Sequence, residues 1–485
     1  MTSHQLPNDP SLEYLRNEAR TLQRQVRAGA PEALEAVREH HPGAVDAAMF
    51  RLASAQLVVA RSYGFPSWSR LRRHLEVVAR YSRSPHKQPA GRSTEGSAPL
   101  ADDFLRLACL TYGADERARR QRARELLLAH PEIGTASIHT MSVVGDVAAA
   151  RALLAADPSL ARREGGPHAW EPLLYLTYSR LDGEDDRSST LEVARLLLRH
   201  GADPNAGYLW EVNPSPFTAL TGAFGGGEDA VNQPPHQHAM DLARLLLQAG
   251  ADPNDSQALY NRQFDPSDEH LEILFAFGLG SGDGGPWHAR LAPAHPTPQE
   301  MVEGQLRWAA RSNMIGRVQL LIHHVADPDA LRSAYAIAER SGNAEIASIL
   351  VEAGATPEPL DPIQSLLAAC MRGDRAAVAA IMATDPTLAG RAAEAEPERV
   401  IRAAELGRRE AVRLLVELGF DVNVIRRTSA LHAAAYRGDL EMVKLLCELG
   451  ADPTARDTEF GATPLGWARH NQKDEVAAYL TERAA

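Results

Sequence analysis

The sequence predicts an all-α solenoid, a row of stacked helix-turn-helix units, over most of its 485 residues. Two stretches near the C-terminus repeat each other, because Leu431 and Leu465 stand 34 positions apart (465 − 431) in matching contexts. A period of roughly 33 residues is typical of paired helices that cannot bury their apolar faces alone. A hydrophobic content of 44% with only 6% aromatic residues fits helices packed closely through small side chains.

Each part of this repeated unit has a physical reason. Thr428 and Thr463 are expected to cap the first helices, since a hydroxyl can accept from an unpaired backbone N–H. Pro464 takes the first helical position, where its missing donor costs nothing. Gly450 supplies the left-handed residue that ends the second helix. The buried stripe of that helix is expected to consist of Val443, Leu445 and Leu446.

On these residues the two units resemble ankyrin repeats, and the chain resembles a bacterial ankyrin-repeat domain-containing protein. Thr428 with Leu431-His432, and Thr463-Pro464-Leu465, stand on the Thr-Pro-Leu-His box of that family. The resemblance implies a curved stack with one concave face free for recognition. It also implies that His432 and His139, at the box position, bond the backbone of the adjoining turn.

The same frame extends back along the chain and predicts about eleven units between Asp103 and Ala485. Helix-ending motifs recur at Gly201-Ala-Asp-Pro, Gly250-Ala-Asp-Pro, Gly354-Ala-Thr and Gly419-Phe-Asp. We expect a helical module at residues 1–81, a linker at 82–100 and an ankyrin-like solenoid at 101–485, irregular at 165–310.

The N-terminal module is predicted to be four helices. Its stretch from Leu52 to Leu71 resembles a small helical module that often precedes ankyrin repeats in bacterial proteins. One interpretation is a cap on the apolar end of the first repeat. The other is a docking module that uses the basic helix holding Arg70, Arg72, Arg73 and His74. The linker is predicted from the Pro, Gly and Ser residues between Ser82 and Ala98.

Charge is uneven along the chain, whose formal net charge is −12. Residues 1–130 carry 20 Lys and Arg against 14 Asp and Glu, whereas the remainder carries 31 against 49. The acidic solenoid argues against binding of a phosphate backbone, so nucleic acid is an unlikely partner, with a small opening left for the basic N-terminal part.

Three cysteines, Cys109, Cys370 and Cys447, form neither a disulfide framework nor a metal-binding spacing, which suits a reducing compartment. We see no signal peptide and no 18-residue apolar run, so neither secretion nor a membrane span is expected. A cytoplasmic protein is predicted, and the Ala/Arg-rich usage suggests a bacterium.

The irregular region at 165–310 is the predicted recognition surface. It contains an acidic insertion at 182–186 and a longer extension at 225–238, and insertions in repeat proteins often lie on the binding face. The segment 260–264 stands where a first helix should be. Trp and Tyr are common recognition anchors, although large aromatics could merely fill the core. The expected binding residues are Tyr175, Tyr178, Trp210, Glu211, Tyr260, Asn261, Arg262, Trp287 and Trp308, with Arg180 beside them.

Chemical motifs are weak. Residues 280–285 match G-x-G-x-x-G, but they follow a helix and run into Pro286-Trp287 rather than a helix, so we read a loop. His236, His238 and Asp241 lack the further ligands of a zinc site, and the acidic insertion lacks the pattern of a calcium loop. We therefore predict no metal and no cofactor, and no catalytic residue can be named.

The leading hypothesis is a non-catalytic scaffold that binds a protein or peptide on its concave face. An alternative is an enzyme or small-molecule-binding protein with a pocket built from residues 165–310. In that case Glu211 or His139 would be the acid or base, with Tyr260 and Arg262 steering the substrate. A weaker alternative is a nucleic-acid-linked regulator that acts through the N-terminal module.

Overall fold

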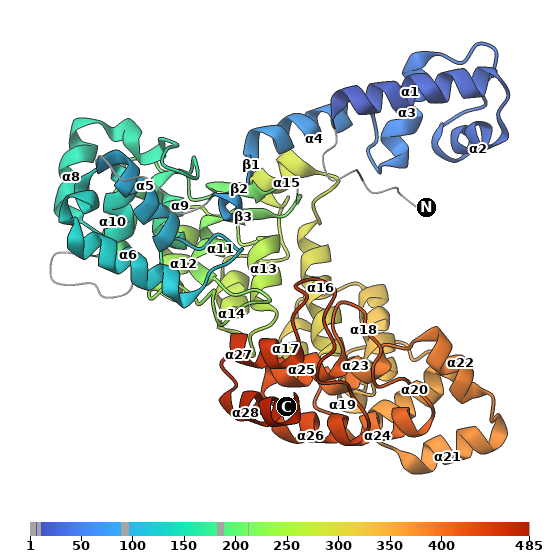
Figure 1. Ribbon diagram of the computed structural model, residues 1–485. Coiled ribbons are helices and arrows are strands. Elements are labelled where there is room, and N and C mark those ends of the chain that lie inside the picture. Colours follow the sequence, from blue (N-terminus) through green and yellow to red (C-terminus); the bar gives the residue numbers. More distant parts are fainter. Residues whose placement is uncertain (1–5, 7–10, 89–96, 182–188, 212, 485) are drawn as a thin grey trace. The chain divides into compact units, whose positions relative to one another are not determined.

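A computed structural model describes residues 6, 11–88, 97–181, 189–211 and 213–484 (Figure 1). The chain forms two compact units, residues 1–301 and residues 302–485, and each is described by itself. Helices dominate both units. The predicted acidic insertion at 182–186 lies outside the described residues, as do positions 89–96 of the predicted linker.

The helices of the first unit follow the predicted periodicity. They are α1 (Leu12–Arg27), α2 (Pro31–His40), α3 (Leu52–Ser62), α4 (Trp68–Tyr81), α5 (Ser97–Ala108), α6 (Arg117–Ala129), α7 (Ile138–Val144), α8 (Val147–Ala156), α9 (Pro172–Tyr178), α10 (Thr190–Arg199), α11 (Ala219–Phe224), α12 (Ala239–Gln248), α13 (Ser256–Arg262), α14 (Glu269–Ala276) and α15 (Gly285–Leu291). Short 3-10 turns are η1 (Pro85–Lys87), η2 (Pro131–Thr135) and η3 (Pro158–Arg162).

The second unit also consists of paired helices, and the boundary between the two units falls within α16. Its helices are α16 (Pro298–Arg311), α17 (Ile315–Leu321), α18 (Pro328–Arg340), α19 (Ala344–Glu352), α20 (Pro362–Arg372), α21 (Arg375–Thr384), α22 (Leu388–Ala395), α23 (Arg399–Glu405), α24 (Arg409–Glu417), α25 (Ala430–Arg437), α26 (Leu440–Glu448), α27 (Pro464–His470) and α28 (Asp474–Ala484).

The caps of the C-terminal helices agree with the prediction except at one position. Thr463 caps α27 by accepting from the N–H of Gly466, and Pro464 follows it at the first helical position. The cap of α25 is Ser429 and not Thr428, because Ser429 forms a reciprocal capping box with His432. Ser429 stands two residues before Leu431, as Thr463 does before Leu465, so the helix begins one residue later than a cap at Thr428 predicts.

Successive units of the second half bury one continuous core. The first helices of adjacent pairs pack side by side, α23 on α25 and α25 on α27. Leu415, Val443 and Leu446 are fully buried in this core, together with the small residues Ala404 and Ala434. Small side chains let neighbouring helices approach closely, as the low aromatic content predicts.

The N-terminal module joins the first unit through α4 and the strand that follows it. Helices α1 to α4 share a core that includes Leu15, Phe50 and Leu71. The end of α4 packs on α15, where Val78 meets Trp287 and Leu291. His74, expected in a basic docking helix, is buried.

A small mixed sheet corrects the purely helical prediction. Strand β1 (Ser82–Arg83) pairs in parallel with β2 (Gly207–Trp210), which pairs antiparallel with β3 (Pro216–Thr218). β1 begins inside the range predicted as a linker. The sheet adds a strand to the finger loop between α10 and α11 and leaves the helix pairs intact.

Two further expectations change in the irregular region. Residues 260–262 belong to a regular helix, α13, capped by Asp255, which accepts from the N–H of Ala258. The glycine-rich segment leads into helix α15, not into a loop, because Gly284 in a left-handed conformation turns the chain and Pro286 opens the helix. The preceding element is α14, so the strand that a dinucleotide site needs is not there.

None of the described helices combines the length and apolar character needed to cross a membrane.

Candidate binding sites

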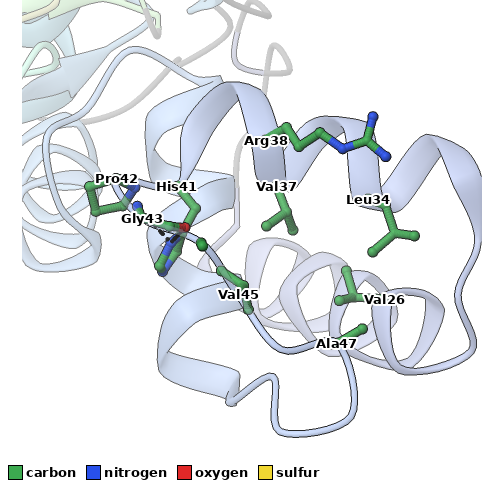
Figure 2. Close-up of a pocket in the computed structure, with 10 residues that line it drawn as sticks. Val26, Leu34, Val37, Arg38, His41, Pro42, Gly43, Val45 and Ala47 are labelled. Carbon is green, nitrogen blue, oxygen red and sulfur yellow. Dashed lines mark hydrogen bonds between the residues drawn. The ribbon is translucent and has the colours of Figure 1, made fainter.

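Three hollows in the structure could accept another group. The first lies in the N-terminal module between α1, α2 and the loop after α2, with a volume of about 300 Å³ (Figure 2). Val26, Leu34, Val37 and Val45 line it, and His41 Nδ1 lies 3.0 Å from the carbonyl oxygen of Gly43. Arg38 and His41 also line it, so its wall is mixed polar and apolar, and nothing in the structure indicates what would fill it.

The second hollow lies in the irregular region and holds about 190 Å³. Four segments meet there: the end of α4 with β1, the turn from residue 162 to 171, the finger that carries β2, and α15. Its aromatic walls are Tyr81, Trp170, Tyr208 and Trp287. The Trp170 and Tyr208 rings stack with centroids 4.9 Å apart, and Tyr81 meets the Trp287 ring edge-on at 5.0 Å.

The charged residues around this cavity are mostly paired within the chain. Arg80 and Arg83 both bind Glu164, the former at 2.6 Å. Arg162 lies 3.9 Å from Asp203. The guanidinium of Arg290 lies over the rings of Tyr81 and Trp287 at 5.2 and 4.8 Å from their centroids, a cation–π contact.

Glu171 differs from the other carboxylates of the cavity. Its Oε2 atom is buried and has no hydrogen-bond partner among the described residues. Burial, aided by the negative charge of Asp203, raises the pKa of Glu171 from its usual 4.5 to about 7. A carboxyl group with a pKa near neutrality in a cavity is a functional-site candidate.

The structure places two predicted binding residues in the core rather than on a surface. Tyr175 and Tyr178 are fully buried. The Tyr175 hydroxyl donates to the carbonyl of Gly165 and that of Tyr178 donates to the carbonyl of Thr218. Both rings contact Trp170, so they support the cavity wall from behind.

Trp210 and Glu211 are held by the segment after β1. The Trp210 ring stacks on His86 at 4.3 Å, and its Nε1–H donates to the carbonyl of Thr111. Glu211 binds Lys87 at 2.5 Å and His86 at 3.2 Å. Hydrogen bonding to Lys87 lowers the pKa of Glu211, which opposes a role as a general acid.

The α13 residues lie on different faces. Tyr260 is exposed, and its hydroxyl donates to Glu228 at 2.6 Å. Asn261 is buried and accepts from the Gln257 side chain. Arg262 pairs with Asp265 at 2.9 Å. None of the three lines the Glu171 cavity.

The two remaining predicted tryptophans, Trp287 and Trp308, lie in different units. Trp287 lines the Glu171 cavity, and its Nε1–H donates to the carbonyl of Asn205. Trp308 belongs to α16 in the second unit. Of the nine predicted binding residues, Trp287 is therefore the one that lines the cavity directly.

The box histidines act as the resemblance implies. His139 Nε2 lies 2.9 Å from the carbonyl oxygen of Arg163, and His432 Nε2 lies 3.0 Å from that of Ala462. Burial lowers the pKa of both imidazoles. His139 is thus occupied by the backbone of the next turn, which leaves the acid/base hypothesis for it without geometric support.

His236 and His238 do not form a metal site with Asp241. His236 is buried and its Nδ1 accepts from the backbone N–H of His238. Across the described part of the chain, no group of three His, Cys, Asp or Glu side chains is arranged to hold a metal ion.

The third hollow is a groove of about 790 Å³ in the second unit. It follows the turns within three successive helix pairs, at Gly342, Gly373 and Gly407. Its charged lining residues are Arg372, Arg408, Arg409, Glu410 and Arg413. The groove is therefore basic, although the chain carries a net charge of −12.

Arginines crowd one another next to this groove. Arg402 donates to the carbonyl of Arg311, and Arg399 donates to that of Arg340. Burial, together with the positive charges of these three neighbours, lowers the pKa of Arg311. Burial and Arg402 likewise lower the pKa of Arg408, which donates to the carbonyls of Ser341 and Met371.

Comparison with known proteins fits this second unit. Residues 400–485 match the family model described as ankyrin repeats, three copies. The chain contains an ankyrin-repeat domain. Part of the chain is also similar to short segments of two curated relatives: 46% identity over 81 residues with the E3 ubiquitin-protein ligase Ufd4 of Drosophila melanogaster, and 42% over 73 residues with the E3 ubiquitin-protein ligase hecd-1 of Caenorhabditis elegans.

These matches are local. They cover 16% and 15% of this chain, and only 3% of each relative. Ankyrin repeats generally mediate protein–protein interaction, which supports a scaffold role for the domain. The ligase activity named for the relatives belongs to proteins of which this chain spans a small fraction.

Sequence reasoning missed both Glu171 and the arginine groove. Glu171 reads as an ordinary residue before Pro172 at a helix start, and its environment comes from segments up to about 120 residues away in the sequence. The groove had a signal, because Arg311, Arg340, Arg372 and Arg437 recur at the ends of first helices. The net charge of −12 of the whole chain nevertheless pointed away from a basic groove.

Proposed function

We propose that the protein is a non-catalytic ankyrin-repeat scaffold and that its second unit binds an acidic segment of a partner protein. The observation that carries the proposal is the basic groove along the turns at Gly342, Gly373 and Gly407. Of its arginines, Arg372 and Arg413 have no carboxylate partner within ion-pair distance among the described residues, and Arg409 reaches Asp439 only at 3.9 Å.

The charge of the groove favours an anionic partner for a physical reason. Burial and the positive charge of Arg402 lower the pKa of Arg408, which lines the groove, and a carboxylate placed beside Arg408 relieves that repulsion. Guanidinium groups bind carboxylates with two parallel hydrogen bonds, which also fixes the partner's orientation. A rigid groove loses little entropy on binding.

We also propose the number of repeats, the role of the N-terminal helices, the concave contact face, the origin and the location that the sequence predicts. The helix pairs are taken as about eleven units, with the N-terminal helices as a cap or docking module. A concave face of the first unit remains a second proposed contact surface, with exposed Tyr260 and half-buried Trp210 among its aromatic residues. Bacterial origin and a cytoplasmic location are also part of the proposal.

The test uses the full-length chain and a short fluorescent peptide rich in Asp and Glu. We expect saturable binding that weakens with added salt, and a loss of about tenfold or more, ~1.4 kcal/mol, in the double variant Arg372→Gln/Arg413→Gln. The control is Arg391→Gln, an exposed arginine of the same unit that pairs with Asp385 outside the groove.

Two results would contradict the proposal. One is equal peptide affinity in the double variant and in the control. The other is preferential binding of single-stranded DNA of equal charge, lost in the double variant, which would make the groove a nucleic-acid site instead.

A further inference from the structure

The residues that line the Glu171 cavity carry three buried polar atoms without a hydrogen-bond partner in the described chain. One is Glu171 Oε2, a hydrogen-bond acceptor when the carboxyl is ionised. The second is the Nε1–H of Trp170, a donor on a side chain that is only 1% exposed, and the third is the hydroxyl of buried Tyr208. Buried polar atoms without partners are rare in folded proteins, and a bound group is one explanation for them.

The charges around the cavity restrict the ligand class. Its lining contains four arginines and three carboxylates, so a positively charged ligand meets net repulsion. An anion meets the Glu171 carboxylate, while Arg80, Arg83 and Arg162 already face Glu164 and Asp203. The fourth arginine, Arg290, lies over the Tyr81 and Trp287 rings. A neutral group that donates one hydrogen bond and accepts through a carbonyl satisfies Glu171 and Trp170, and the second lone pair of that carbonyl is left for the Tyr208 hydroxyl.

Size and wall shape restrict it further. A volume of about 190 Å³ corresponds to roughly six water molecules at ~30 Å³ each. It is smaller than the roughly 300–1,000 Å³ of sites for drug-sized ligands. The walls are the flat rings of Trp170, Tyr208 and Trp287. A small planar group therefore fits better than a branched or bulky one.

The backbone holds Trp170 firmly in place. Gly165 and Trp170 exchange two backbone hydrogen bonds of 3.0 and 3.2 Å. Ala169, between them in the turn, adopts a left-handed conformation with φ 51°. A non-glycine residue in that region is strained, and such strain is concentrated at binding sites and active sites. The turn that carries Trp170 is thus preorganised as part of the cavity wall.

We propose that this cavity binds a primary carboxamide, whose N–H donates to Glu171 and whose carbonyl accepts from the Trp170 indole. The amide belongs either to a free small molecule or to a glutamine side chain of a peptide. This site is in the first unit and does not depend on the acidic partner proposed for the second.

The test follows the indole N–H resonances of the ¹⁵N-labelled full-length protein. The probes are L-glutamine and the tripeptide Gly-Gln-Gly, with L-glutamate and L-norleucine as matched compounds that lack the amide. We expect an amide probe to shift an indole resonance saturably, and the matched compounds to leave it unchanged. A response to Gly-Gln-Gly alone would assign the site to peptides, and a response to glutamine alone to a free metabolite.

Variants decide the assignment. Glu171→Gln replaces the charged carboxylate acceptor by a neutral, weaker amide oxygen and should weaken binding by about tenfold or more. Glu35→Gln, an exposed substitution in α2, should have no effect. Trp170→Phe identifies the resonance, and if Trp170→Phe does not fold, single Trp→Phe variants of the other five tryptophans assign it by exclusion.

The proposal is overturned if neither amide probe shifts an indole, if L-glutamate or L-norleucine acts equally, or if Glu171→Gln binds as the parent does. Binding should also strengthen as the pH rises through about 7, because the acceptor is the ionised carboxylate. The charged groups that face Glu171 are Arg80, Arg162, Glu164 and Asp203.

Discussion

Two carboxyl groups of the first unit, one fully buried and one partly buried, differ in whether the chain supplies hydrogen-bond partners to their oxygens. Asp255 is fully buried, and burial raises its pKa to about 6. It accepts from the hydroxyls of Thr218 and Thr221 and from the N–H of Ala258. Glu171 has a similarly raised pKa but leaves Oε2 unpaired. Asp255 therefore has hydrogen-bond donors within the chain, whereas Glu171 Oε2 has none among the described residues.

Replacing Glu171 should change how stability depends on pH. Its folded-state pKa of about 7 lies above the ordinary 4.5, so the parent loses stability as the pH rises from about 4.5 to 7. Glu171→Gln removes this loss. After discounting for partial exposure, we expect the variant to gain on the order of 1–2 kcal/mol over the parent at pH 8, and nothing at pH 4.

Urea unfolding of both proteins at the two pH values measures the difference. Glu35→Gln should show the same stability difference from the parent at both values, since that side chain is exposed. A gain for Glu171→Gln that is equal at pH 4 and pH 8 would mean that the carboxyl is not destabilised by ionisation.

Arg180 anchors the extension at 225–238, since its guanidinium donates to the carbonyl of Pro234. Its buried guanidinium donates to the carbonyls of Pro234, Gly222, Thr177 and Ser179 at 2.6 to 2.9 Å. Burial lowers its pKa to about 10, so it remains charged near neutral pH. Arg180→Met leaves these carbonyls unpaired, and we expect a loss of about 3 kcal/mol or more.

Limited proteolysis provides the local measurement for Arg180→Met. Cleavage should begin within residues 225–238, since Pro234 loses its anchor. Arg195→Met on α10, which pairs with Glu192 on the surface, should leave cleavage unchanged. Faster cleavage elsewhere, with the extension intact, would contradict the anchoring role.

At the scale of elements, local sequence determined the helices and distant contacts determined the rest. The helix pairs were predictable because apolar periodicity and helix-ending glycines are local features of the sequence. Gly373 and Gly438 are examples, since each ends a first helix in a left-handed conformation. The sheet was not, because Ser82 and Arg83 become a strand only by pairing with residues 209 and 210. Trp287 was predicted as a binding residue from its residue type alone, whereas nothing local in the sequence indicates that Glu171 lines the same cavity.

The close approach at the sheet gives a prediction for β2. A Cβ added at Gly207 would lie 2.9 Å from the Trp287 ring and 3.0 Å from the carbonyl oxygen of Phe217. Gly207→Ala should therefore destabilise the first unit by about 1–3 kcal/mol and alter the Trp287 environment. Unfolding followed by tryptophan fluorescence measures both effects.

Gly304 is the matched control for Gly207. It lies inside helix α16, where an added Cβ meets nothing within 4 Å. Gly304→Ala should stabilise the protein by about 0.5–1 kcal/mol through helix propensity. If Gly207→Ala were also neutral or stabilising, the packing of β2 on α15 would be looser than the contact distances indicate.

The whole molecule consists of two compact units, each with its own core. Leu415 belongs to a cluster whose members all lie in the second unit, and Leu209 to one in the first. In a repeat protein each unit is stabilised by its neighbours, so stability spreads along a continuous stack and weakens where contacts become few. We therefore expect the full chain to unfold in two transitions.

Core truncations assign the transitions. Leu415→Ala should lower one of them and Leu209→Ala the other, each by about 2–5 kcal/mol, because both side chains are fully buried and leave cavities. Calorimetry of the two variants and the parent makes the measurement, and the acidic peptide should raise only the transition that Leu415→Ala lowers. A single transition shifted by both variants would show instead that the repeats fold as one cooperative stack, and binding at the arginine groove would then stabilise the Glu171 cavity as well.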